Sequence, residues 1–385
     1  MSKRRAPSSD HECRRCAAKM ARPTTPQKHL YVVLDDQRLA YSVHKLDVDD
    51  DAAFAGAGAD SSSAARLPEP PFLRLEVQRP GDRCHFSALG DKIIAFLRNR
   101  PLATLVHDTK TAAMAIGSPP PPALSSHVYL TVAAADRLYV LPNVSAHTAG
   151  EMYYLEEEPP LPPPAELAEQ CPEYASDEEE EMRRSWRRKQ EKWAWSTVAS
   201  SAMMPFNPVH ATCCALHPDG RTFFVSVERH PRNWMEHGTF SFDAGRGVWT
   251  RHGGWLLPFR GRAFFDAELD AWVGLDERGH LCASNGVSRR GARRTPPAWR
   301  RGREAVLRER DPERRLGAAL AHMGGGGRFC LVERAVRAGV ETKRSSIGDG
   351  DGCVLYVSTF CVRYGKDGEL TTTARRDAGC YAVSR

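Results

Sequence analysis

The feature that most constrains the fold is a strand–turn–strand unit that recurs along the whole chain. Each unit holds two runs of four to eight residues that are rich in Val, Phe, Tyr, Leu and Thr. Such runs, bounded by Gly, Asp or Asn, are typical of strands joined by tight turns. They lie at residues 30–48, 86–97, 104–116, 127–141, 213–227, 238–250, 263–275, 318–333 and 355–374.

The spacing of these units indicates how they assemble. The turns at Gly90, Asp136, Gly220, Asp270 and Gly326 are separated by 46, 84, 50 and 56 residues, and the long step falls to 47 without residues 156–192. A period of about 45 to 55 residues with up to four short strands is typical of β-propeller blades. Helical solenoids and parallel α/β sheets are excluded, because amphipathic helices do not alternate with the strands.

The sequence therefore predicts an all-β fold, a single β-propeller of about six blades. The hairpin at 30–48 and the strand at 72–77 precede the first full unit. They either complete a sixth blade or close the ring by pairing with the last strands near residues 380–383. Five or seven blades remain open alternatives.

Two segments echo each other and predict the blade boundaries. Residues 194–206 read AWSTVASSAMMPF and residues 248–259 read VWTRHGGWLLPF. We expect Trp195 and Trp249 to lie in outermost strands, packed between neighbouring blades. The apolar residues with Pro-Phe that follow would cross to the innermost strand of the next blade, because proline suits an extended backbone that needs no ladder donor.

Length and composition limit the class of protein and the cellular compartment that we expect. The chain has 385 residues, 41% of them apolar, enough for a packed core. The first 28 residues carry charge throughout and lack the apolar region of a signal peptide. With 11 cysteines, this favours free thiols in the cytoplasm or the nucleus, and Lys3-Arg4-Arg5 is a candidate nuclear signal. No run is long and apolar enough for a bilayer.

The predicted organisation is a basic N-terminal tail at 1–28 and a propeller domain at 29–385, with loop insertions at 50–68, 156–192 and 288–315. Residues 156–181 hold 11 acidic and no basic residues, whereas residues 288–315 hold 11 arginines against four acids. The chain's net charge of +6 therefore comes from one stretch, so the overall charge does not indicate a nucleic-acid-binding protein.

The charged insertions hold the candidate interaction residues. The candidate interaction loop comprises Arg289, Arg290, Arg293, Arg294, Trp299, Arg300 and Arg301. Arginines around a tryptophan could bind single-stranded nucleic acid through phosphate contacts and stacking, but the four acids favour an adaptable protein-binding surface. Ser176 precedes an acidic run and is a candidate phosphorylation site.

The other chemistry-bearing residues predict no catalytic, cofactor or metal site. His11, Cys13 and Cys16 have a zinc-like spacing, but no second ligand pair follows nearby. The histidines between His210 and His252 lack helical pair spacing, and the glycines at 324–327 precede no phosphate-binding lysine. Asp266, Glu268 and Asp270 alternate, which is typical of a polar hairpin tip. Cys213 and Cys214 are adjacent, so in a strand they would point to opposite faces.

Several motifs resemble a large family of uncharacterised plant proteins, abundant in grasses. The segments PPFLRLEV, HFSALGDKIIAF, LATLVHDTKTAAMAIGSPPP, DRLYVLP and LHPDGRTFFVSV, followed by GTFSFD, carry this resemblance over roughly residues 28–385. The family has a domain of unknown function related to kelch-like and F-box-associated propellers. The resemblance implies the fold and no catalytic residues. The first 28 residues lack the apolar helices of an F-box.

The function predicted from these features is a monomeric, non-catalytic protein-interaction module with an unknown protein partner, no cofactor and no membrane contact. Propeller loops vary while the blades stay rigid, which suits recognition. One alternative is an enzyme or small-molecule binder that uses the central channel, which would need polar groups converging from several blades. The other is nucleic-acid binding through the arginine-rich loop.

Overall fold

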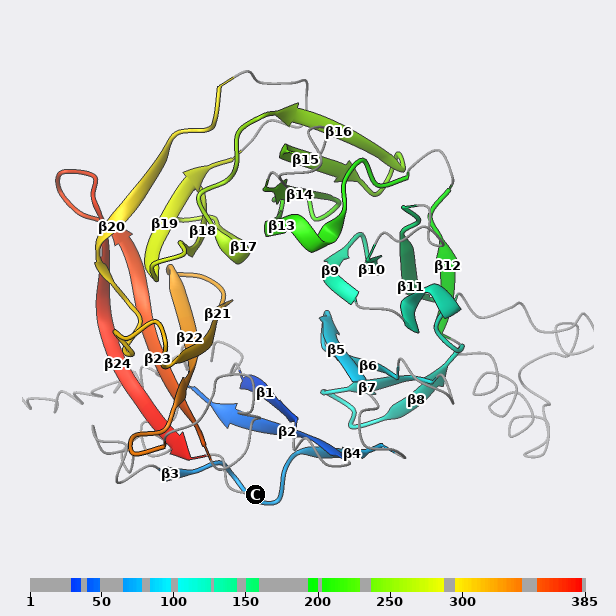
Figure 1. Ribbon diagram of the computed structural model, residues 1–385, viewed down its shortest axis with the longest axis horizontal. Coiled ribbons are helices and arrows are strands. Elements are labelled where there is room, and N and C mark those ends of the chain that lie inside the picture. Colours follow the sequence, from blue (N-terminus) through cyan, green and yellow to red (C-terminus); the bar gives the residue numbers. More distant parts are fainter. Residues whose placement is uncertain are drawn as a thin grey trace, which may run out of the picture.

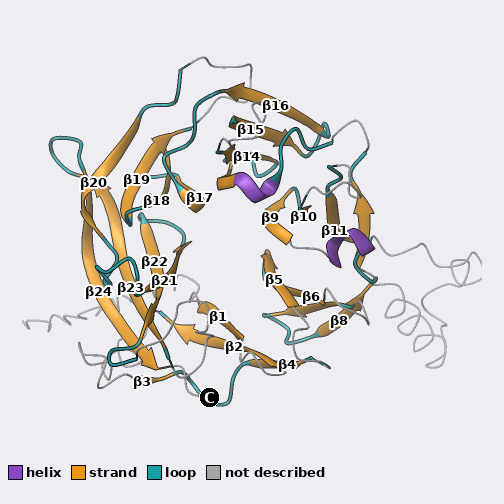
Figure 2. Cartoon of the chain, in the orientation of Figure 1, coloured by secondary structure: helices purple, strands orange, loops and turns teal. Residues whose placement is uncertain are grey.

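The strands form a closed ring around a central axis (Figure 1). The computed structural model describes residues 29–35, 40–48, 65–77, 84–97, 103–125, 128–143, 150–158, 193–199, 203–228, 237–286, 295–340 and 352–382. Strands dominate the described part of the chain, with two short 3-10 helices, η2 (Pro122–Ser125) and η5 (Pro208–His210) (Figure 2). None of the described helices is long and apolar enough to cross a membrane.

The first three blades follow the chain in order, each with its earliest strand innermost. Blade one consists of β1 (His29–Asp35), β2 (Ala40–Asp47) and β4 (Leu73–Glu76). Blade two consists of β5 (Cys84–Leu89), β6 (Lys92–Leu97), β7 (Thr104–Asp108) and β8 (Met114–Gly117). Blade three consists of β9 (Val128–Ala134), β10 (Arg137–Pro142), β11 (Tyr153–Glu157) and β12 (Trp193–Thr197).

The last three blades continue the same antiparallel pattern. Blade four consists of β13 (Ala211–Leu216), β14 (Thr222–Val227), β15 (Gly238–Asp243) and β16 (Val248–Gly253). Blade five consists of β17 (Arg260–Asp266), β18 (Ala271–Leu275), β19 (His280–Asn285) and β20 (Trp299–Ala305). Blade six consists of β21 (Arg315–His322), β22 (Arg328–Val336), β23 (Cys353–Tyr364) and β24 (Leu370–Ala382). The prediction of an all-β propeller of about six blades is confirmed.

The hairpin at 30–48 and the strand at 72–77 complete a blade, the first of the two alternatives, and a short strand that the sequence did not predict pairs with the last strand. Strands β1, β2 and β4 build blade one, while β3 (Ala65–Arg66) runs parallel to the end of β24, with Ala65 opposite Tyr381. Leu67, next along the chain, is buried in a cluster with residues of blade one and of blade six. The ring is therefore closed by contacts between its first and last blades.

Blades four and five are joined more closely than the other pairs. Their innermost strands, β13 and β17, pair in parallel, with Cys214 opposite Arg262, and the two blades form one eight-stranded sheet. Cys213 and Cys214 are both buried and pack in different clusters, one facing blade five and the other facing blade three. The expectation that these neighbours point to opposite faces is confirmed.

The five turn positions used to measure the repeat are all real turns between the first and second strands of a blade. Gly90, Asp136, Gly220, Asp270 and Gly326 have φ angles of 56°, 57°, 69°, 46° and 72°. Positive φ costs little at glycine and is tolerated by aspartate in tight turns. The regular spacing of Gly and Asp in the sequence therefore reports the hairpin geometry of consecutive blades.

The echoed tryptophans lie where the sequence predicts. Trp195 is in β12 and Trp249 is in β16, the outermost strands of blades three and four. Trp195 packs on Phe96 of blade two with ring centroids 5.2 Å apart, and Trp249 packs on Phe206 of the preceding crossing at 5.1 Å. Phe206 and Phe259 are both buried, so each crossing is anchored in the core between two blades.

The structure differs from the expected loop insertions at their ends. Within 288–315, residues 299–305 form β20 and Arg315 begins β21. Most side chains of β20 are exposed because the strand is outermost, so it lacks the apolar alternation that marks a strand in sequence. Within 50–68 the structure has β3, and residues 156–157 belong to β11. Residues 51–64, 159–192 and 287–294 lie outside the described part.

Candidate functional site

One face of the ring gathers the turns that join strands within a hairpin. In each blade the chain reverses between the first and second strands and again between the third and fourth, so both turns lie at the same end. The amide of Ala244 donates to the carbonyl of Arg221 between two such turns of blade four, and the amide of Ala135 donates to Gly220 between neighbouring blades. We call this the hairpin face, and the opposite one the crossing face.

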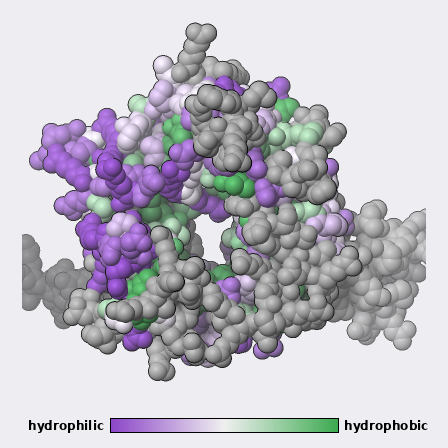
Figure 3. Space-filling model, in the orientation of Figure 1, coloured by the Kyte–Doolittle hydropathy of each residue, from purple (hydrophilic) through white to green (hydrophobic). Residues whose placement is uncertain are grey.

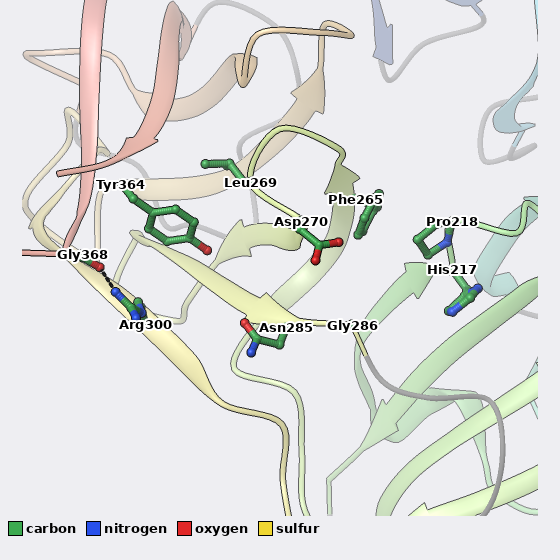
Figure 4. A pocket seen from close by; sticks show the side chains of 10 residues that line it. All are labelled: His217, Pro218, Phe265, Leu269, Asp270, Asn285, Gly286, Arg300, Tyr364 and Gly368. Carbon is green, nitrogen blue, oxygen red and sulfur yellow. Dashed lines mark hydrogen bonds between the residues drawn. The ribbon is translucent and has the colours of Figure 1, made fainter. Parts of the chain in front are cut away.

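A cavity of about 700 Å³ opens on the hairpin face where blades four, five and six meet (Figure 4). It is lined by His217 and Pro218 of blade four, by Phe265, Leu269, Asp270, Asn285, Gly286 and Arg300 of blade five, and by Tyr364 and Gly368 of blade six. Three blades thus contribute one surface from segments that are far apart in sequence. Asn285 and Gly286 directly precede residues 287–294, which hold four arginines of the candidate loop.

Arg300 is held in place from the neighbouring blade. Its guanidinium carbon lies 5.5 Å from the ring centroid of Tyr364, and its Nη1 donates to the carbonyl of Gly368. Gly368 has a φ of 73°, and a Cβ there would collide with the guanidinium. The turn between β23 and β24 therefore needs glycine at this position to bring its carbonyl to Arg300. We call this the Arg300–Tyr364 pair.

The hydroxyl of Tyr364 points into the cavity, toward Asp270 and Asn285 (Figure 4). Partial burial raises the pKa of Tyr364, the cation of Arg300 lowers it, and the carboxylate of Asp270 raises it, with a net increase. The phenol is therefore protonated at neutral pH and available as a hydrogen-bond donor. The cavity offers a donor, a carboxylate and an amide at its centre, with a cation at one side.

Blade four contributes a rigid turn to the other side of the cavity. Asp219 Oδ1 accepts hydrogen bonds from the amides of Arg221 and Thr222 at 2.9 and 2.8 Å, and the amide of Asp219 donates to His217 Nδ1 at 3.2 Å. Burial opposes ionisation of Asp219, but the donated hydrogen bonds outweigh it and lower the pKa to about 2. The turn that presents His217 is thus fixed by an ionised carboxylate.

Asp266 has a structural place beneath the cavity. It is 1% exposed, its Oδ1 accepts the amides of Glu268 and Leu269 at 3.0 Å, and its Oδ2 lies 3.0 Å from His322 Nε2 of blade six. Of the three alternating acids in this segment, Glu268 and Asp270 are exposed. They form the polar hairpin tip that the sequence indicates, and Asp270 lines the cavity.

The structure separates the predicted interaction residues. Trp299, Arg300 and Arg301 lie in β20, and Trp299 is 49% exposed. Arg300 lines the cavity, whereas Arg301 contacts Asp276 Oδ2 at 2.9 Å and His280 Nδ1 at 2.7 Å. The remaining predicted residues, Arg289, Arg290, Arg293, Arg294 and Ser176, lie outside the described part of the chain.

Most described arginines of the basic stretch make contacts within the ring. Arg308 stacks over Tyr356 with its guanidinium carbon 4.7 Å from the ring centroid, and Arg310 donates to the carbonyl of Ala305. Arg314 pairs with Glu309 at 3.4 Å, and Arg315 donates to the carbonyl of Glu309 at 2.9 Å. These contacts hold the four arginines against the surface of the ring.

The central channel and the metal-like motifs give weaker grounds for a functional site than the cavity does. An opening remains at the centre of the ring in the space-filling view (Figure 3). Of the exposed residues on β17, Arg262 donates from Nη2 to the carbonyl of Thr131 at 2.8 Å, which links blade five to blade three. Among the described residues, no three His, Cys, Asp or Glu side chains are grouped to hold a metal ion. His11, Cys13, Cys16 and His230 are outside them.

Sequence reasoning missed Tyr364, Asn285 and Gly368 as site residues. Each looks like an ordinary strand end or turn residue, and they meet Arg300 only because β19 and β23 end, and β20 begins, on the hairpin face. The glycine after a turn aspartate in GKDGE was the one signal that could have been followed, since it marks the turn that holds Arg300.

Comparison with solved structures gives distant likenesses. A putative 6-phosphogluconolactonase from Bacteroides fragilis is 10% identical over 93% of this chain and 84% of that one, with a TM-score of 0.41. YCF48 bound to D1 peptide is 12% identical over 92% and 86% of the two chains, with a TM-score of 0.38. The N-terminal domain of Nup159 is 10% identical over 91% and 75%, with a TM-score of 0.31.

The sequence itself gives a more specific assignment. No curated protein matches it. A family model described as a protein of unknown function, DUF1668, matches residues 27–381, nearly the whole chain. With its blades and its hairpin-face cavity, this chain belongs to the DUF1668 family.

Proposed function

We propose that this chain is a non-catalytic protein-interaction module that binds a protein partner at the cavity on the hairpin face. The observation that carries the proposal is the Arg300–Tyr364 pair, which lies at an open cavity formed by three blades. Arginine and tyrosine are enriched among the residues that dominate binding energy at protein interfaces. Their mutual stacking reduces the conformational freedom lost when a partner binds.

The surroundings of the pair suit a protein partner. Asp270 and Asn285 add polar groups around the cavity, and Phe265 and Leu269 add apolar surface. Such a mixture is typical of the core and rim of an interface. Trp299 is exposed on the adjoining outer strand and extends the surface beyond the cavity.

Two carboxylates next to the cavity, outside its lining, are engaged in holding its loops, whereas Asp270 in the lining is a binding group of the proposed surface. Asp219 and Asp266 each accept two backbone amides within their turns, so their oxygens are committed to holding the loops. An acid or base in catalysis must instead exchange a proton with a bound substrate. The rigid turns would serve to keep the binding surface in shape.

The experiment is affinity capture with the tagged full-length chain from cytoplasmic and nuclear extracts. Tyr364→Ala and Arg300→Ala should each reduce the recovery of a shared set of proteins at least tenfold. The matched control is Arg278→Ala, which removes an exposed arginine from a turn on the crossing face. Thermal unfolding of each variant checks that the ring is intact. Recovery that is unchanged in both site variants, or equally reduced in the control, would refute the proposal.

A further inference from the structure

Blade one is incomplete among the described residues. It has three strands in the order β1-β2-β4, whereas each of the other blades has four of its own. In the described part of the chain, no fourth strand lies along β4. The outermost position of this blade is therefore vacant in the described ring.

The neighbouring blade exposes apolar side chains beside this position. On β8, the outermost strand of blade two, Met114 is 50% exposed and Ile116 is 74% exposed. They are two residues apart in a strand, so they point to the same face. Large apolar side chains together on an outer strand are a feature of protein-binding surfaces.

Cross-strand pairing shows which way this face points. Met114 lies opposite His107 of β7, and the ring of His107 packs edge-on against Phe72 of blade one with centroids 5.1 Å apart. Residues opposite each other in neighbouring strands share a face. Met114 and Ile116 therefore face blade one, while Gly117, on the other face of β8, lies against Trp193 of blade three.

Blade one presents a matching surface. Leu75 lies opposite Tyr41, whose ring packs against Phe86 of blade two at 5.4 Å, so Leu73 and Leu75 face blade two. Arg74 lies opposite Ser42, which in turn lies opposite Leu34, so Arg74 and Glu76 are on the other face of blade one, the one toward blade six. Both side chains are exposed there, with Arg74 Nε 3.8 Å from Glu76 Oε1. The apolar contact between the two blades thus continues outward from Tyr41 and Phe86 to Met114 and Ile116, where blade one stops.

We propose that an extended strand of a partner protein adds to the edge of β4 as the fourth strand of blade one. Backbone hydrogen bonds would provide affinity, as in other cases of strand addition to a sheet edge. Alternate apolar residues of the partner would cover Met114 and Ile116. The residues between them would be charged, an acid beside Arg74 and a base beside Glu76, because opposite charges in neighbouring strands stabilise the pairing. This site is separate from the Arg300–Tyr364 pair.

The test uses a phage-displayed library of random ten-residue peptides selected on the full-length chain. Enriched peptides should alternate apolar with charged residues, and their affinity should fall at least tenfold for Ile116→Lys. Val248→Lys is the matched control, because Val248 is also an exposed apolar residue of an outermost strand, 41% exposed. Alternate backbone nitrogens of a bound peptide donate to β4. Methylating either the odd-numbered or the even-numbered nitrogens should therefore abolish binding, and methylating the other set should not.

Hydrogen exchange then separates the possible occupants. Because β4 pairs with β2, alternate amides of residues 73–76 bond to β2 and the others point to the open edge. The edge amides should exchange rapidly in the free protein and slowly with added peptide. Slow exchange of these edge amides without peptide would show that the chain's own segment fills the position and would overturn the proposal. A dimer that Ile116→Lys dissociates would overturn it in favour of a second copy. Peptides that bind the Ile116→Lys and Val248→Lys variants with equal affinity would also overturn it. Peptides whose binding is lost only in the Tyr364→Ala variant bind at the Arg300–Tyr364 pair.

Discussion

The indole nitrogen of Trp195 donates to the hydroxyl of Thr104 at 2.8 Å, across the junction between blades three and two. The ring of Trp195 also packs edge-on against Phe96 of blade two. One residue of the sequence echo thus joins its own blade to the preceding one by both a hydrogen bond and an aromatic contact.

We expect Trp195→Phe and Thr104→Val each to lower the free energy of unfolding by about 1–2 kcal/mol, because each removes one partner of a hydrogen bond and Thr104 is fully buried. The double variant should lose less than the sum of the two. A double-mutant cycle measured by urea unfolding checks this. Additive losses would show that the bond does not couple the blades.

Phe259, at the end of the second echoed segment, packs against Gly274 of blade five. A Cβ at Gly274 would lie 2.7 Å from Cδ1 of Phe259. Gly274→Ala should therefore destabilise the fold by about 1–3 kcal/mol through overpacking, and adding Phe259→Leu should recover part of the loss. Thermal unfolding of the three variants provides the measurement, and no recovery in the double variant would contradict the packing. Phe259→Ala and Trp249→Ala should each destabilise the ring in the same measurement, without a direct effect on partner binding.

Asp219 predicts a pH dependence of stability. Its pKa falls from 3.8 in the unfolded chain to about 2 in the folded one. Its ionised form therefore adds stability that is complete above about pH 5 and is lost as the pH falls through 3.8 toward 2. Asp219→Asn should cost about 2 kcal/mol at pH 7 by linkage. Urea unfolding should show that the unfolding free energies of the unchanged chain and of Asp219→Asn differ less at pH 3 than at pH 7. An equal difference at the two pH values would refute the lowered pKa of Asp219.

Leu67 tests how the ring closes. It is buried between Val32 and Leu34 of blade one and Leu355 and Val357 of blade six. Leu67→Ala should lower the free energy of unfolding by about 2–4 kcal/mol. Hydrogen exchange should then speed up in both blades together. Faster exchange confined to blade one would show that the closing contact does not hold blade six.

The parts of the fold that follow from local chemistry were predictable from the sequence. Tight turns require positive φ, so Gly and Asp mark them at regular intervals, and Gly90 and Gly220 are examples. The crossings require buried apolar residues, which the repeated Pro-Phe segments supply at Phe206 and Phe259.

The candidate site was less predictable because it depends on assembly. Arg300 stood out in sequence by its charge, but its partners Tyr364 and Gly368 come from a hairpin more than sixty residues later. Outermost strands such as β20 expose most of their side chains and so carry no clear alternation. The open edge of β4 in the described ring was not predicted either, because an edge depends on which strands pair in the assembled sheet.

The most direct test of the central claim is hydrogen exchange of the full-length chain with and without a captured partner. Binding at the hairpin face predicts slower exchange in residues 217–221, 265–270 and 364–370. It predicts no change in residues 276–279 and 306–314 of the crossing face. Protection of the crossing face with an unchanged hairpin face would contradict the proposed function.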